Sequence, residues 1–174
     1  DPSFAFEGLA VKAVFRINRA LLALVHADLS RPHGFAHERV GFIACKVAAL
    51  QDGHLVLAES YNPVHDDDYE DDPTVGAMMG PGAIRKALQF AYHHPVGMFH
   101  VHRHEHKGQP GFSRTDVRES AKFIPDFWKV RPSTPHGAIV LSYDAIAGAW
   151  WDPATRQAQT IDEFAILGRR LWLW

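Results

Sequence analysis

The sequence has one cysteine, no long apolar run and no cluster of basic residues, and each absence excludes a class of protein. Cys45 has no partner for an internal disulfide, so the fold depends on a hydrophobic core, and we expect this thiol to be buried. No uninterrupted apolar stretch reaches the roughly 18 residues that a transmembrane helix needs, so we expect no membrane partner. No secretory signal is visible at the start, and together with the unpaired thiol this predicts a cytoplasmic protein.

Charge is balanced along most of the chain. The 18 basic and 20 acidic residues give a net charge of -2, and the basic residues are dispersed. Because a surface that binds nucleic-acid phosphates needs clustered positive charge, nucleic acid is not an expected partner. Residues 66–72 form the one dense acidic run. It lacks the alternating acids and the closing glutamate of a calcium loop, so we interpret it as a mobile, solvated loop, or else as a contact for a basic protein surface.

The pattern of apolar residues predicts one α/β (α+β) domain that spans residues 1–174. The hydrophobic fraction of 47% and the length are ordinary for a single globular core. Alternating or continuous apolar runs predict strands, and apolar residues at helical spacing predict helices. The predicted strands are 11–17, 38–50, 54–61, 96–101, 137–143 and 147–152, with a possible last strand at 157–164; the predicted helices are 18–29, 82–93 and 113–128. The apolar end, residues 171–174, is expected to pack on the domain.

Two histidines at the end of a predicted strand form the most informative motif. His100 and His102 are two residues apart, so their side chains point to the same face of the strand and can bind one metal ion. Ser113 is a natural helix N-cap, which places Asp116 at the third helical position. Two histidines and one carboxylate, with a fourth position for water, are the ligands of a catalytic zinc site. The alternative is chance, since the chain contains 12 histidines.

A zinc-activated water also needs a base and an oxyanion donor, and the sequence offers a candidate for each. Glu38 stands at the entry to an apolar strand, where a carboxylate has no packing role and would point into a cleft. The Ser113 hydroxyl lies at the start of the helix that carries Asp116, beside the expected metal ion. We therefore predict that Glu38 and Ser113 are catalytic residues.

The combination of Glu38, His100-Val-His102 and Ser113-Arg-Thr-Asp116 resembles the JAMM motif of the JAB/MPN metalloproteases. The resemblance implies a JAB/MPN-like mixed sheet flanked by helices, with the layering of cytidine deaminases. It also implies that His100, His102 and Asp116 bind Zn²⁺, that Glu38 is the general base and then the general acid, and that Ser113 stabilises the tetrahedral intermediate. The implied substrate is a ubiquitin-like protein or its conjugate, cleaved after the C-terminal tail.

One departure from the family concerns the loop after the histidines. Members commonly have proline after the second histidine and about seven residues before the serine, whereas here Arg103 follows and ten residues intervene. The longer loop is similar to that of some prokaryotic members associated with ubiquitin-like conjugation systems. We interpret His104 and His106, within this insertion, as solvent-exposed loop residues, with contacts to substrate or to a second ion as the alternative.

Other functions remain open at this point. A non-catalytic MPN-like scaffold is one alternative, although such proteins typically lack the ligands that are present here. A zinc hydrolase of small amides or of sulfur-carrier conjugates is another. Metallo-β-lactamases and cupins fit less well, because their metal motifs require an Asp-His pair or a more distant glutamate where this chain has His104 and Glu105.

Overall fold

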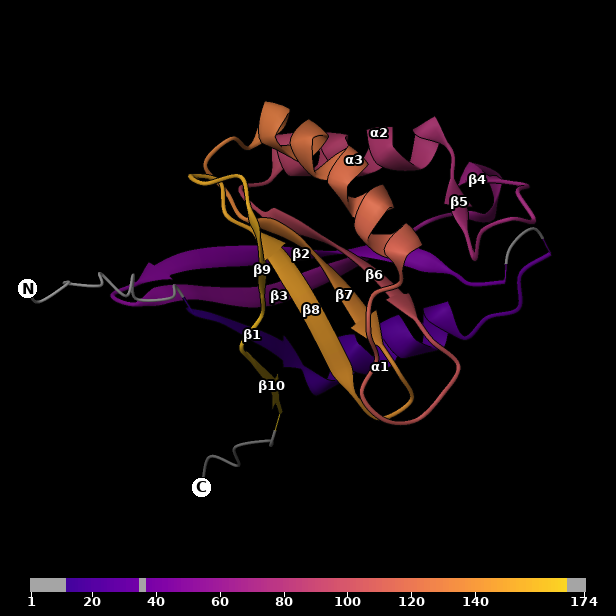
Figure 1. Cartoon of the computed structure of the whole chain (residues 1–174), viewed down its shortest axis with the longest axis horizontal. Helices are drawn as coiled ribbons and strands as arrows, with labels where there is room; N and C mark the ends of the chain where they lie inside the picture. Colours follow the sequence, from indigo (N-terminus) through magenta and orange to yellow (C-terminus); the bar gives the residue numbers. More distant parts are fainter. Residues whose placement is uncertain (1–11, 35–36, 169–174) are drawn as a thin grey trace, which may run out of the picture.

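The computed structural model describes residues 12–34 and 37–168 and confirms the predicted α/β fold (Figure 1). An eight-stranded mixed sheet carries one helix on one face and two helices on the other. The strands of this sheet are β1 (Lys12–Asn18), β2 (Val40–Leu50), β3 (Gly53–Pro63), β6 (Gly97–Arg103), β7 (His136–Leu141), β8 (Ile146–Trp151), β9 (Ala158–Thr160) and β10 (Glu163–Leu167). The helices are α1 (Arg19–Leu29), α2 (Pro81–His93) and α3 (Arg114–Val130), and the segment before α2 forms a 3₁₀ turn, η1 (Asp66–Asp68), and two short strands, β4 (Tyr69–Glu70) and β5 (Met78–Met79).

The strand order is β10-β1-β3-β2-β6-β7-β8-β9. Strands β2 and β3 form the hairpin that the sequence predicts, and β2 also pairs antiparallel with β6. Gly53 begins β3 beside β1, where a Cβ atom would lie 2.1 Å from the carbonyl oxygen of Lys12. Only glycine permits this close approach between the hairpin turn and β1.

The predicted last strand, 157–164, is in fact two strands at opposite edges of the sheet. β9 pairs with β8, whereas β10 pairs with β1. Between them, Ile161 donates its backbone N–H to Gly148 in β8, and Asp162 donates its own to Ala13 in β1. The sheet therefore curls until its two edges approach each other, which no local pattern in the sequence indicates.

Each face of the sheet has its own hydrophobic core. Helix α1 buries Leu21, Val25 and Leu29 against one face, in a cluster that includes Phe15 and Trp150. Helices α2 and α3 cover the opposite face, where alternate residues of β2 and β6 meet the aromatic side chains of α3. Cys45 is buried, as expected. The apolar residues 171–174 lie outside the described residues.

The acidic run is folded, which corrects its interpretation as a mobile loop. Asp66 pairs with Arg39 at 2.6 Å and Asp68 with Lys86 at 2.5 Å, so two of its carboxylates hold this segment to the residue before β2 and to α2. The neighbouring acidic side chains Asp67, Glu70 and Asp71 are exposed, as a solvated loop requires. Within the described ranges, no helix combines the length and the apolar character needed to cross a membrane.

His136 generates a prediction about stability and pH. It is fully buried; its Nδ1 accepts the Met98 N–H at 3.0 Å, and its Nε2 lies 3.3 Å from the Arg131 carbonyl oxygen. Burial lowers the pKa of His136 to about 4. Between that value and the usual pKa near 6.5, the unfolded chain binds a proton that the folded chain does not. Stability therefore falls as the pH drops through this range, by about 2 kcal/mol between pH 7 and pH 4.5.

We expect His136→Gln to lose less stability than the wild type over this range, because the titrating imidazole is gone. Urea unfolding at both pH values, with chelator present, measures the difference. His93→Gln, at an exposed site, is the control and should retain the wild-type slope. Equal slopes for His136→Gln and the wild type would contradict this account.

Candidate metal centre

A cavity of about 410 Å³ lies on the face of the sheet covered by α2 and α3. Its wall includes all five residues that the sequence analysis selects as a site: Glu38, His100, His102, Ser113 and Asp116. These residues come from the segment before β2, from β6 and from the start of α3. The tertiary structure thus brings together residues that are far apart in the sequence.

The histidines reach the cavity through the alternation of β6. His100 lies opposite Phe42 and His102 opposite Val40 in the β2–β6 ladder, and the two imidazole rings are 5.9 Å apart. The His100 ring also contacts Phe123 of α3, with ring centroids 5.3 Å apart. Burial and the neighbouring His102 lower the pKa of His100 to about 3. His100 is therefore neutral at pH 7, the form in which imidazole binds a metal ion.

Two buried imidazole nitrogens in this pair have no hydrogen-bond partner among the described residues. They are Nε2 of His100 and Nδ1 of His102. A buried polar nitrogen without a partner is costly, because it has lost its hydrogen bonds to water. A ligand in the cavity would relieve this cost for any nitrogen that faces it.

Helix α3 begins as the sequence predicts, with Ser113 as its N-cap and Asp116 at the third helical position, and the two residues also form a reciprocal capping box. Ser113 is the N-cap, Asp116 donates its N–H to the Ser113 hydroxyl at 3.1 Å, and Ser113 donates its own N–H to Asp116 Oδ2 at 2.6 Å. The same Oδ2 lies 3.5 Å from Nε2 of His102. Burial raises the pKa of Asp116, but the hydrogen bonds from His102 and Ser113 outweigh it and hold this pKa well below its usual range. The carboxylate is therefore ionised and held in place.

Among the described residues, one group of potential metal ligands has its donor atoms close together, and it contains His104 in place of the predicted ligand His100. His102, His104 and Asp116 each offer a ligand atom, and these atoms lie within 4.8 Å of one another. His104 is partly buried and lines the cavity, so its interpretation as a solvent-exposed loop residue is wrong; His106 is exposed, as expected. The missed signal was the continued alternation of histidines at 100, 102 and 104.

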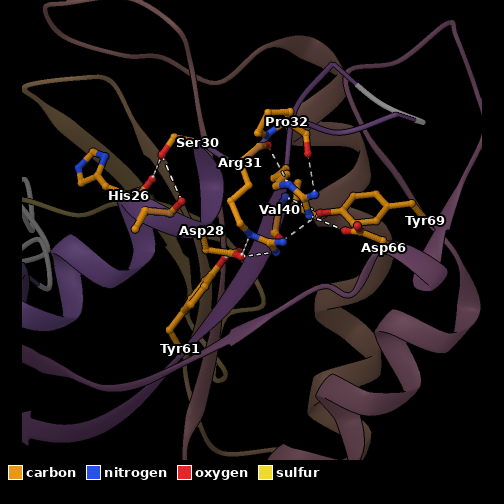
Figure 2. Close-up of polar contacts among 11 residues, drawn as sticks. His26, Asp28, Ser30, Arg31, Pro32, Val40, Tyr61, Asp66 and Tyr69 are labelled. Carbon is orange, nitrogen blue, oxygen red and sulfur yellow. Dashed lines mark hydrogen bonds and ion pairs between the residues drawn. The ribbon is translucent and has the colours of Figure 1, made fainter.

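Glu38 is held beside the cavity by the residue that follows it. The Arg39 side chain is buried; its guanidinium donates to the carbonyl oxygens of Arg31 and Pro32 at 2.9 and 2.8 Å and pairs with Asp66. Figure 2 shows Arg31, Pro32 and Asp66 around these contacts. This guanidinium ties the end of α1, the start of β2 and the acidic segment together. Strand β2 begins at Val40, two residues later than predicted, so Glu38 belongs to the connection before the strand.

The Glu38 side chain lies against the segment before α2. Its backbone N–H donates to the Gly76 carbonyl oxygen at 3.0 Å, and a Cβ atom on Gly76 would lie 2.8 Å from Oε2 of Glu38. Glycine at position 76 thus leaves the space that the carboxylate occupies. The cavity as a whole combines the neutral imidazole of His100, the imidazoles of His102 and His104, the ionised carboxylate of Asp116 and the carboxylate of Glu38. The group His102, His104 and Asp116 within it could hold a metal ion.

No family model matches the chain, and no curated protein matches it. Among solved structures, it is similar to the STIL N-terminal domain from Trichoplax adhaerens, with 10% sequence identity and a TM-score of 0.43. The match covers 79% of this chain and 40% of that one. The chain therefore spans less than half the length of this structural neighbour.

The Arg39 contacts predict a stability difference between two arginines. Lysine carries its donors on one nitrogen and cannot reproduce the planar fork by which three nitrogens of Arg39 meet separate acceptors, so Arg39→Lys should leave buried carbonyl groups unpaired and lower the free energy of unfolding by about 2 kcal/mol. Arg31→Lys, at the exposed end of an ion pair with the partly buried Asp28, should change it by less than about 0.5 kcal/mol. Urea unfolding of both variants tests this, and similar losses would contradict the role assigned to Arg39.

Proposed function

We propose that this protein is a zinc-dependent peptidase or isopeptidase of the JAB/MPN type. In this proposal His100, His102 and Asp116 bind the zinc ion, Glu38 is the general base and then the general acid, and Ser113 stabilises the tetrahedral intermediate. The observation that carries the proposal is the presence of Glu38 in the wall of the cavity that the two histidines and Asp116 also line. Glu38 lies far from the other motif residues in the sequence, so only the fold can bring it to this cavity.

The donor set fits zinc. Zinc in proteins prefers imidazole nitrogen and carboxylate oxygen among its ligands. His100 is neutral and Asp116 ionised at pH 7, so neither needs to lose a proton before it binds a cation. A zinc ion held there would supply Lewis acidity and lower the pKa of a water molecule to about 7.

Glu38 and Ser113 have the chemistry for the two remaining roles. The Glu38 carboxylate accepts the proton of the attacking water and donates it to the nitrogen of the leaving amine. The Ser113 oxygen already accepts the Asp116 N–H, so its own hydroxyl proton is free to be donated to the oxyanion. Ser113 is exposed, so a substrate can reach it.

The substrate class in this proposal follows from the family resemblance: the C-terminal tail of a ubiquitin-like protein, either in a precursor or in a conjugate. In this proposal, the edge of β5 is the candidate binding place for an extended tail. Strand β5 pairs only with β4 among the described strands, and its residues Met78 and Met79 line the cavity. A tail could add to β5 by main-chain hydrogen bonds and bring its terminal peptide bond to Glu38.

Glu38→Gln is the principal test. The amide cannot accept the proton, so cleavage should fall at least about 100-fold while the zinc content stays at the wild-type level. Zinc measured by mass spectrometry, and hydrolysis of C-terminal Gly-Gly fusions of ubiquitin-like proteins, give the two readouts. Glu59→Gln is the matched control, because Glu59 pairs with Lys46 on the surface.

The other outcomes identify the alternatives. Stoichiometric zinc with no hydrolysis of fusions or of small acyl-amino acids would favour a non-catalytic scaffold. Hydrolysis of the small amides alone would favour a small-amide hydrolase. Glu38→Gln with full activity would contradict the proposed mechanism.

Gly76→Ala is a second test, directed at the position of Glu38. The added methyl group overlaps the carboxylate, which can move because it ends a flexible side chain. We expect at least about 10-fold slower cleavage, since small displacements of catalytic groups are costly, with little change in thermal stability or zinc content. Gly34→Ala, which meets no heavy atom within 4 Å, is the control. Equal activity of the two variants would contradict the position assigned to Glu38.

A further inference from the structure

We propose that His104 is an additional protein ligand of the metal ion and binds it together with His102 and Asp116. This inference rests on the metal centre of the proposed function and does not depend on hydrolysis. His104 lies outside the JAMM-like motif, within the ten-residue insertion after His102.

The distances between the side chains match those around one zinc ion. With metal–ligand bonds of about 2.0–2.1 Å, the ligand atoms of tetrahedral zinc lie roughly 3.3 Å apart. Nε2 of His104 lies 3.2 Å from Nε2 of His102, which in turn lies 3.5 Å from Oδ2 of Asp116. Two edges of the expected tetrahedron are therefore present in the structure.

A hydrogen bond between the two imidazoles is the competing explanation for the 3.2 Å distance. It requires a proton on one of the two Nε2 atoms, as does the hydrogen bond from His102 to Asp116, whereas metal binding requires a lone pair on both imidazoles. The carboxylate of Asp116 stands near the same nitrogen of His102, so the three groups form a pocket of donor atoms for a cation. The two explanations differ in what they predict for metal affinity.

The backbone of the insertion is anchored, so His104 is presented from a defined position. Its N–H donates to the Leu141 carbonyl oxygen at 2.8 Å, which continues the β6–β7 pairing beyond the end of β6. The next side chain, Glu105, is paired with Arg103 at 2.7 Å and accepts a hydrogen bond from the Tyr143 hydroxyl.

Further along the insertion, two more hydrogen bonds join it to the turn between β7 and β8. Tyr143 donates its N–H to the His106 carbonyl oxygen at 2.9 Å, and Gly108 donates to Asp144 Oδ1 at 2.7 Å. A solvated turn with freely moving side chains would not show these contacts. The anchoring lowers the entropic cost of placing the His104 imidazole at the ion.

His104 changes the kind of metal site that the chain would form. With His100, it gives four protein ligands, a closed set of the kind found in structural zinc sites, whereas catalytic sites keep a position for water. His104 would then compete with water and substrate for the fourth position. The insertion would thereby determine whether His104 or water occupies the fourth position when no substrate is bound.

The test measures metal binding alone, on the whole chain, with Zn²⁺ and Co²⁺ as probes. Competition with a chromogenic chelator should show at least about 10-fold weaker zinc binding for His104→Ala. Loss of a direct ligand should weaken binding at least as much as loss of a residue that only hydrogen-bonds to a ligand. The Co²⁺ visible spectrum should change as well. His106→Ala is the matched control, since His106 is exposed in the same loop, and it should bind both ions like the wild type.

Zinc-edge X-ray absorption counts the imidazole ligands directly. His104→Ala should show one imidazole fewer than the wild type, and an equal count would overturn the inference, as would wild-type zinc affinity and an unchanged Co²⁺ spectrum in His104→Ala. These outcomes are independent of Glu38. Zinc bound through His104 with no cleavage would refute only the peptidase, and cleavage with His104→Ala at full affinity would refute only the added ligand.

Discussion

The antiparallel pairing of β2 with β6 is the constraint on which the site depends. Val40 lies opposite His102 and Phe42 opposite His100, so these four side chains point to the same face of the sheet. One set faces α2 and α3, where Val40 and Phe42 are buried beside the histidines. The same register, continued by two residues, would set Glu38 opposite His104. A shift of one residue would turn the histidines toward α1 and remove the site.

The site combines groups that are costly to bury. His100 and His102 each carry a buried nitrogen without a partner among the described residues, and Asp116 remains ionised although burial opposes its charge. Such groups persist when the surrounding fold holds them in place. Here the capping box holds Asp116, ring contacts with Phe42 and Phe123 hold His100, and Arg39 fixes the connection that carries Glu38. A bound cation would offset part of this cost, because it attracts the carboxylate and coordinates the imidazoles.

The connections around the sheet carry more structure than their composition suggests. The acidic segment is tied to the residue before β2 and to α2 by ion pairs, and the histidine-rich insertion is tied to the turn after β7 by main-chain and side-chain hydrogen bonds. Asp66 of the acidic segment pairs with Arg39, which fixes the connection that carries Glu38, and the insertion carries His104, which lines the cavity. Polar composition predicts that a loop is at the surface, but it does not predict whether the loop's charges find partners.

The sequence by itself determined the three helices, the central strands and the local geometry of part of the candidate site. Apolar periodicity located the helices and the central strands, Ser113 and Asp116 specified their capping box, and the spacing of His100 and His102 set both on one face, because these features depend on local geometry. Only the tertiary structure decided that Glu38 reaches the same cavity, that His104 joins His102 and Asp116, and that β9 and β10 occupy opposite edges of a curled sheet. Each of these depends on pairing between segments distant in sequence, whose partners and register are set by packing of the whole domain and not by neighbouring residues.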